Sequence, residues 1–211
     1  MRPYAGIVHR YDREMLLSSA QPIVSAVVSA VAVAARQLEA TQSSLVSLEP
    51  SAPIDLRQLR QVLGQFATGI TVIATRATDG DLVGLTANSF GALSLDPPLI
   101  TWALRLNSSN LPIFQAADQF VVNVLAEAQV EVSRRFASSA GNKFEGIPFA
   151  LGQSGLPLIH GAAAWFECRT VSQQIVGDHC LFIAAVETFA RSESPPLIFH
   201  GGGYFTLGSK F

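Results

Sequence analysis

The sequence predicts a mainly β fold with flanking helices, in which an antiparallel barrel follows an extra N-terminal helix. Short β-branched and aromatic segments succeed one another with few helices between them, which favours a barrel over a doubly wound parallel sheet. Gly201, Gly202 and Gly203 form a plain run near the C-terminus instead of the spaced glycine turn of a dinucleotide-binding βαβ unit. The stretch before residue 53, in contrast, has helical periodicity.

The predicted N-terminal helix covers residues 15–40, where Val24, Val28 and Val31 fall on one stripe. The uncharged run from Met15 to Ala35 is long enough to cross a bilayer, but its Ala, Ser and Val residues insert weakly. We therefore expect a packed helix that lies across a dimer, and no membrane span. Export, anchoring or a poorly ordered extension remain as alternatives.

A Ser-rich linker from Thr41 to Pro53 separates this helix from the rest of the chain. The predicted division is therefore an N-terminal helical extension, residues 1–53, and a barrel domain, residues 54–211. The barrel domain opens with Asp55, a good helix N-cap before leucines at helical spacing. A hairpin turn is expected at Thr78 to Asp81.

The expected strands of the barrel domain are short and β-branched, and two short helices are expected between them. The strands are Ile70–Ala74, Leu82–Phe90, Leu99–Leu104, Phe120–Leu125, Ala164–Ile175, Leu181–Thr188 and Leu197–Phe199; the helices are Ser109–Ala117 and Ala126–Phe136.

Composition excludes several classes of protein. Charged residues make up only 14% of the chain and hydrophobic ones 49%, so we expect a large core and burial of further apolar surface in a homodimer. The net charge of −2 and the lack of a basic tract argue against nucleic-acid binding. Two cysteines fit a reducing cytoplasm, and the four histidines have no metal-ligand spacing.

Three stretches, in this order and at this spacing, carry a family resemblance. They are VLGQFATGITVIAT with GLTANSFGALSLDPP (Val62 to Pro98), FASSAGNKFEGIPF (Phe136 to Phe149), and GDHCLFIAAV with PLIFHGGGY (Gly177 to Tyr204). The chain resembles the flavin reductase-like family over about residues 55–208. That resemblance implies the FMN-binding split barrel, an antiparallel Greek-key barrel.

The resemblance also implies a function. Family members are usually homodimers that pass a hydride from NADH or NADPH to FMN or FAD, and the reduced flavin diffuses to a partner monooxygenase. Two alternatives stay open: a flavoenzyme that holds its flavin tightly and acts on an organic substrate, and a flavin-binding protein without turnover. Because a cofactor carries the difficult chemistry, the lack of an obvious acid–base motif does not argue against an enzyme.

The resemblance assigns the flavin ring to the strand end at Thr86, Ala87, Asn88 and Ser89. Small side chains there would let the backbone approach a flat ring, while the hydroxyl and amide groups would bind its polar edge. Ala103 and Leu104 are expected to add backbone and apolar contacts. The residues alone favour a simpler interpretation, a turn satisfied by its own Asn and Ser.

The flavin phosphate is expected beside Asn107, Ser108, Ser109 and Asn110, which precede a helical run whose N–H groups and dipole favour an anion. An ordinary helix cap is the structural alternative. A basic side chain is frequent in the family near the position of Ser109, and this chain lacks one. Arg105, or Arg135 beside Phe136, is expected to supply the charge instead.

His179, in the GDH motif, is the expected catalytic residue. In the family this histidine lies where the nicotinamide approaches the flavin, so His179 would position the nicotinamide, and Asp178 would orient the imidazole. Tyr204 is expected to border the dinucleotide, with core or dimer packing as its alternative role.

Overall fold

The computed structural model describes residues 53–209. The expected helix at residues 15–40 lies outside the described residues, so the proposed division of the chain near residue 53 remains a prediction. Within residues 53–209, no helix is long and apolar enough to cross a membrane.

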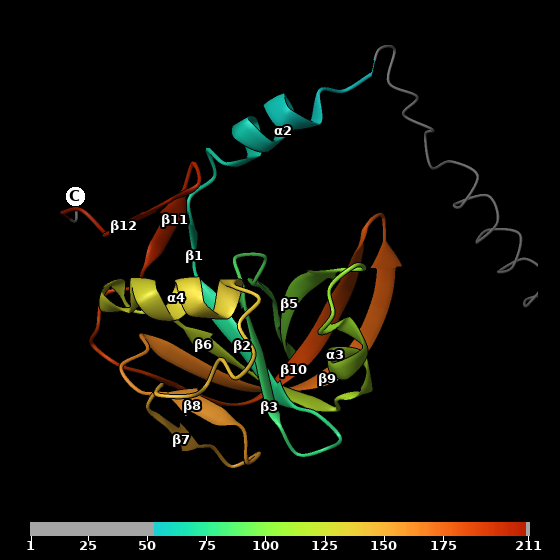
Figure 1. Ribbon diagram of the computed structural model, residues 1–211, viewed down its shortest axis with the longest axis vertical. Helices are drawn as coiled ribbons and strands as arrows, with labels where there is room; N and C mark the ends of the chain where they lie inside the picture. Colours follow the sequence, from blue (N-terminus) through green and yellow to red (C-terminus); the bar gives the residue numbers. More distant parts are fainter. Residues whose placement is uncertain (1–52, 210–211) are drawn as a thin grey trace, which may run out of the picture. The chain divides into compact units, whose positions relative to one another are not determined.

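A seven-stranded antiparallel sheet forms the body of the domain, and its strands run in the order β3-β2-β6-β9-β10-β5-β4 (Figure 1). β3 and β4 follow each other in the chain but lie at the two opposite edges of the sheet. Because they do not pair with each other, hydrogen bonds do not close the sheet into a ring. This is the expected split antiparallel barrel. The strands are β2 (Thr71–Arg76), β3 (Leu82–Ala87), β4 (Gly91–Leu95), β5 (Pro98–Arg105), β6 (Gln119–Val124), β9 (Ala164–Val176) and β10 (His179–Arg191).

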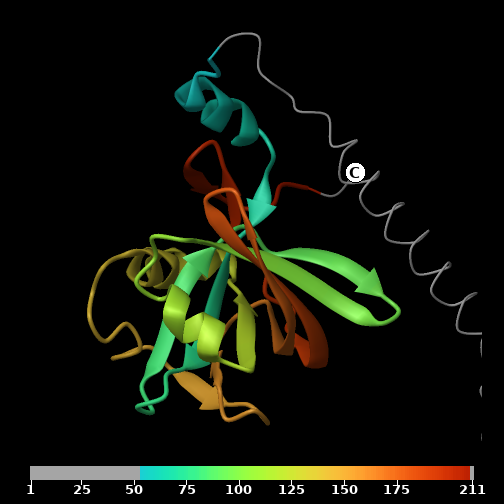
Figure 2. The ribbon, with the colours of Figure 1, turned by 90° about the vertical axis from the view of Figure 1, so that its right-hand side faces the viewer.

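The corner between the two edge strands differs from the expectation of one strand over Leu82–Phe90. β3 ends at Ala87 and β4 starts at Gly91, because the chain leaves one edge of the sheet and joins the other. Figure 2 shows the resulting β4–β5 hairpin, in light green, extending from the rest of the sheet. The corner residues 88–90 therefore lie where the barrel is split.

Two smaller sheets complete the domain. β1 (Thr68–Gly69), β11 (Ile198–His200) and β12 (Gly203–Phe205) form a three-stranded sheet, and β7 (Phe149–Leu151) pairs with β8 (Pro157–Ile159). Of these five strands, only β11 overlaps an expected one. The other four have two or three residues each, which is too short for a period to be recognised.

The helices follow local sequence signals. α2 (Leu56–Leu63) starts as expected, because the Asp55 carboxylate accepts hydrogen bonds from the N–H groups of Arg57 and Gln58. α3 (Leu111–Ala116) is shorter than expected. The segment expected as one helix over Ala126–Phe136 begins with a 3-10 turn, η1 (Glu127–Gln129), and continues as α4 (Val130–Ala137).

Two hydrophobic clusters fill the domain. In the first, the Trp102 ring stacks on that of Phe182, with their centroids 4.4 Å apart, and contacts Phe114 and Phe120 edge to face. The second lies under α4, where the rings of Phe136 and Phe144 pack edge to face at 4.8 Å. α4 is thereby fixed against β3 and β2.

Gly84 is the point at which β3 passes closest to this second cluster. An added Cβ would lie 2.7 Å from Cε1 of Phe136 and 3.3 Å from Cε2 of Phe144. We expect Gly84→Ala to lower the free energy of unfolding by about 1–3 kcal/mol, as overpacking of a core does. Urea denaturation measures this. Gly91→Ala is the matched control, since its nearest neighbour would be Oγ1 of Thr101 at 3.6 Å; equal stability of both variants would contradict the prediction.

Candidate active site

A cavity of about 650 Å³ lies at the split, where β3, β5 and β10 meet the loops after β5 and α4. Its volume is in the usual range for a small-molecule site, about 300–1,000 Å³. It brings together all but two of the residues expected at the site. Those that line it are Thr86, Ala87, Asn88, Ser89, Ala103, Leu104, Arg105, Ser108, Ser109, Asn110, Phe136 and His179.

Hydroxyl groups hold the backbone on one side of the cavity. Ser89 Oγ donates to the carbonyl of Ala103 and accepts from its N–H, both at 3.0 Å, which joins the β3–β4 corner to β5. Thr86 Oγ1 donates to the carbonyl of Ser133 in α4 at 2.6 Å. These two hydroxyls therefore fix the strand ends in place, which leaves a shallow, small-residue surface at Ala87 and Ala103.

The backbone at the start of α3 offers a ligand fewer N–H donors than the sequence predicts. The N–H of Leu111 donates to the carbonyl of Ser108, that of Ile113 to the carbonyl of Asn110, and Pro112 has no N–H. The first turn of α3 thus has no free backbone donor, so a backbone contact to the expected phosphate would come from the loop residues before it. The loop also offers a ligand its hydroxyl and amide side chains.

Lys143 is a cavity residue that the sequence analysis missed. Its Nζ donates to the carbonyl of Phe136 at 3.0 Å and to that of Gly84 at 3.4 Å, so the ammonium bridges α4 and β3. Burial lowers the pKa of this lysine from its ordinary value. Ser138 and Ser139 line the cavity beside it, and Leu85, Asn107 and Ala137 complete the lining. Lys143 and Arg105 are the lysine and arginine side chains that line the cavity.

His179 starts β10 directly opposite Arg105 on β5. Its Nδ1 lies 2.7 Å from Oδ1 of Asp178, and this hydrogen bond lowers the pKa of the aspartate. An ionised carboxylate only accepts hydrogen bonds, so the shared hydrogen is on Nδ1. In the neutral imidazole, Nε2 is then an acceptor. The hydrogen bond to Asp178 thus orients the ring of His179, which lines the cavity.

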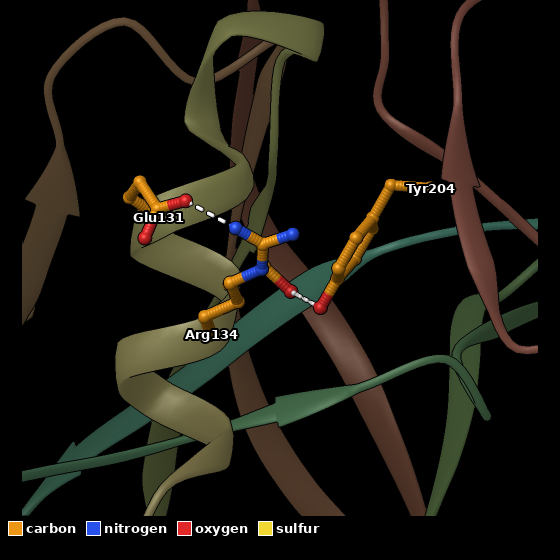
Figure 3. A network of polar contacts seen from close by, with 4 residues as sticks. Glu131, Arg134 and Tyr204 are labelled. Carbon is orange, nitrogen blue, oxygen red and sulfur yellow. Dashed lines mark hydrogen bonds and ion pairs between the residues drawn. The ribbon is translucent and has the colours of Figure 1, made fainter.

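Two of the expected site residues do not line the cavity. Arg135 donates to the carbonyl of Asn142 at 3.3 Å instead. Tyr204 packs beside α4 (Figure 3): its hydroxyl lies 2.9 Å from Oγ of the buried Ser133, and the Arg134 guanidinium carbon lies 5.8 Å from the centre of its ring. Arg134 is in turn paired with Glu131. Within one chain these contacts make Tyr204 a packing residue, and its role toward a dinucleotide stays a prediction.

The donor set fits a flat ring with a phosphate tail. Small residues at the split leave room for a ring, while the hydroxyls of Ser109, Ser138 and Ser139 and the ammonium of Lys143 gather at the other end. A cation with hydroxyl donors is the combination that binds phosphate oxygens. The residues present therefore fit a flavin nucleotide.

The known proteins that this chain resembles are flavin reductases or reductase components. The model of the family described as "Flavin reductase like domain" matches residues 63–208. The chain is 40% identical over 151 residues to the reductase component of a flavin-dependent trigonelline monooxygenase from Acinetobacter baylyi, covering 72% of this chain and 49% of that protein. It is 37% identical over 148 residues to an FMN reductase (NADH) from Agrobacterium fabrum, covering 70% of this chain and 84% of that protein.

Among solved structures, the chain matches a Streptomyces globisporus NADH:FAD oxidoreductase in complex with NAD and FAD fragments. The TM-score is 0.70 at 33% identity, and the match covers 74% of this chain and 98% of that one. The chain spans about half the length of two of the curated relatives that it matches.

Proposed function

Because the chain belongs to the flavin reductase-like family, we propose that it reduces free FMN or FAD with NADH or NADPH. The observation that carries this proposal is the cavity at the split, which small residues of β3 and β5 line together with His179, the hydrogen-bond partner of Asp178. The dihydronicotinamide supplies a hydride, two electrons and one proton, to the flavin, so that one is oxidised as the other is reduced.

The protein's own part in this reaction is binding, orientation and exclusion of water. Thr86 and Ser89 hold the strand ends against which the flavin ring would lie, and the ammonium of Lys143 would hold its phosphate. The oriented Nε2 of His179 would accept a hydrogen bond from the nicotinamide amide. Direct transfer between two stacked rings needs no acid or base once the rings are aligned.

The reduced flavin is proposed to serve a separate monooxygenase in the cytoplasm. The match to a reductase component of such a system supports the partner, and two buried, unpaired cysteines are compatible with a reducing compartment. A homodimer is part of the proposal. Leu95 is 92% exposed, Phe66 80% and Phe189 73%, and large apolar side chains left in water are typical of surfaces that a second copy covers.

Loss of NADH absorbance, measured without flavin and then with FMN or FAD, tests the proposal. Turnover that depends on added flavin and saturates with it is the expected result. The absence of turnover with either flavin and either nicotinamide would refute the proposed activity. Flavin that stays with the protein through gel filtration would instead indicate a bound prosthetic group, and light scattering on the same column measures the dimer.

His179→Ala is expected to raise KM for NADH roughly two- to tenfold, the worth of one neutral hydrogen bond, without changing the Kd of flavin. Steady-state kinetics gives KM, and quenching of flavin fluorescence gives Kd. His200→Ala is the control, because His200 lies in β11 and does not line the cavity. An equal loss of NADH and flavin affinity would assign His179 to the flavin instead.

A further inference from the structure

A groove continues from the active-site cavity along the edge strand β3. A second cavity of about 220 Å³ shares Ser109, Asn110, Ser138, Ser139 and Lys143 with the first. A third cavity, of about 570 Å³, shares Leu82, Val83 and Gly141 with the second. The three cavities are thus consecutive, and the shared hydroxyl and ammonium groups lie where the first opens into the second.

We propose that the two outer cavities bind the adenosine half of FAD, so that this chain prefers FAD to FMN. The inference rests on the proposed function, since it extends the same flavin site. A mononucleotide would end at the phosphate-binding groups around Lys143. A dinucleotide continues beyond them through a second phosphate to a ribose and an adenine, which the outer cavities have the volume to hold.

The charges along the groove suit that order of chemical groups. The ammonium of Lys143 uses two of its three N–H groups on the carbonyls of Phe136 and Gly84, and the third remains for a phosphate. The far cavity instead contains the carboxylates of Asp81 and Glu145. Carboxylates repel phosphate but accept hydrogen bonds from ribose hydroxyls and from the adenine amino group. The far end therefore fits a neutral nucleoside.

The far cavity also has apolar walls. Phe144 and Phe149 line it with Leu82 and Val83, and the two phenyl rings pack edge to face with centroids 5.6 Å apart. Phe144 is buried in the cluster under α4, so its position is set by the core. Aromatic and aliphatic side chains of this kind are what a purine base packs against.

Hydrogen bonds fix both sides of the far cavity before any ligand binds. On one side, the Arg76 guanidinium donates to the carbonyls of Gly80 and Gly155, both at 2.8 Å, and braces the β2–β3 turn. On the other, the Asn142 side-chain oxygen accepts from the N–H of Phe144 at 3.2 Å. A pre-formed site avoids the entropic cost of ordering loops on binding.

The adenosine half of NADH is the competing occupant. The structure favours FAD because the groove leaves the first cavity at the Lys143 side, while His179, the proposed contact of the nicotinamide, is absent from the lining of both outer cavities. A dinucleotide anchored at His179 would have to cross the flavin site to reach the groove.

Gly141→Trp tests the inference, because Gly141 lines both outer cavities and an added Cβ there has no neighbour within 4 Å. Fluorescence titration of the full chain with oxidised FAD and FMN measures binding without turnover. We expect the parent to bind FAD more tightly, and Gly141→Trp to raise the Kd ratio of FAD to FMN at least about tenfold. Gly208→Trp is the matched control, an exposed glycine with equally open space.

Asp81→Ala gives a second, smaller test, since it removes one acceptor in the far cavity; the same ratio should rise roughly two- to tenfold. Unchanged ratios in both variants would overturn the inference. The inference would also be overturned if Gly141→Trp, but not its control, raised KM for NADH with FMN as the acceptor. The groove would then bind the nicotinamide dinucleotide. A parent that binds neither flavin would refute the proposed function itself.

Discussion

Replacement of Lys143 by glutamine is expected to raise the Kd of FMN roughly ten- to a hundredfold, the usual worth of one charged hydrogen bond. The ammonium lies on the cavity wall, held between the carbonyls of Phe136 and Gly84, so its charge is fixed where a phosphate would bind. Flavin fluorescence titration measures the effect. Arg57→Gln is the control, because Arg57 is exposed in α2, away from the cavity.

The same lysine predicts how flavin binding depends on pH. Burial lowers its pKa, so the charge of the free protein is lost at a lower pH than for an ordinary lysine. The affinity for FMN is therefore full below that lowered pKa and falls as the pH rises through it. Lys143→Arg should remove this fall, because a guanidinium stays protonated. A parent and a Lys143→Gln variant with equal Kd values at neutral pH would contradict both predictions.

Asn123→Ala is expected to lower the free energy of unfolding by about 3 kcal/mol. The Asn123 side chain is fully buried; its amide donates to the carbonyls of Val72 and Pro157, and its oxygen accepts from the N–H of Ile159 at 2.7 Å. Alanine leaves these backbone groups without partners, and one buried unsatisfied group alone costs about 1–3 kcal/mol.

Thermal or urea unfolding of the Asn123→Ala variant measures the loss. Asn107→Ala serves as the control, because Asn107 is exposed and its replacement removes no buried bond. The β7–β8 hairpin should also exchange its amide hydrogens faster in the variant, since the side chain of Asn123 ties β8 to β6. A loss of stability no larger than that of the control would show that the hairpin is held by its apolar contacts.

Sequence patterns predicted the long elements well, because periodicity and capping are local, and the split-barrel class followed from the family resemblance. Asp55 caps α2 as expected, and β9 and β10 contain the strands predicted there. The division into two edge strands at Asn88 to Phe90 was not predicted. No local signal marks the point at which a chain leaves one edge of a sheet for the other.

Most residues that line the cavity lie in stretches that carry the family resemblance, but Lys143, although in one of these stretches, was missed because it joins the cavity through the fold. Lys143 stands in a polar loop and reads as a solvated charge, yet the packing of Phe144 under α4 carries it to β3. Arg135 illustrates the opposite error. It adjoins Phe136 in sequence, but neighbours in a helix point to different faces, so the guanidinium leaves the cavity.

The open edge at β3 bears on how readily this protein aggregates. Edge strands with unpaired N–H and C=O groups are the places where chains join one another and aggregate. Here that edge runs along the groove of the proposed flavin site, so the ligand that fills the groove also shields it. Because binding to the folded state adds to its stability, the supply of flavin would set how often this edge is left bare. Added flavin should therefore slow aggregation of this chain.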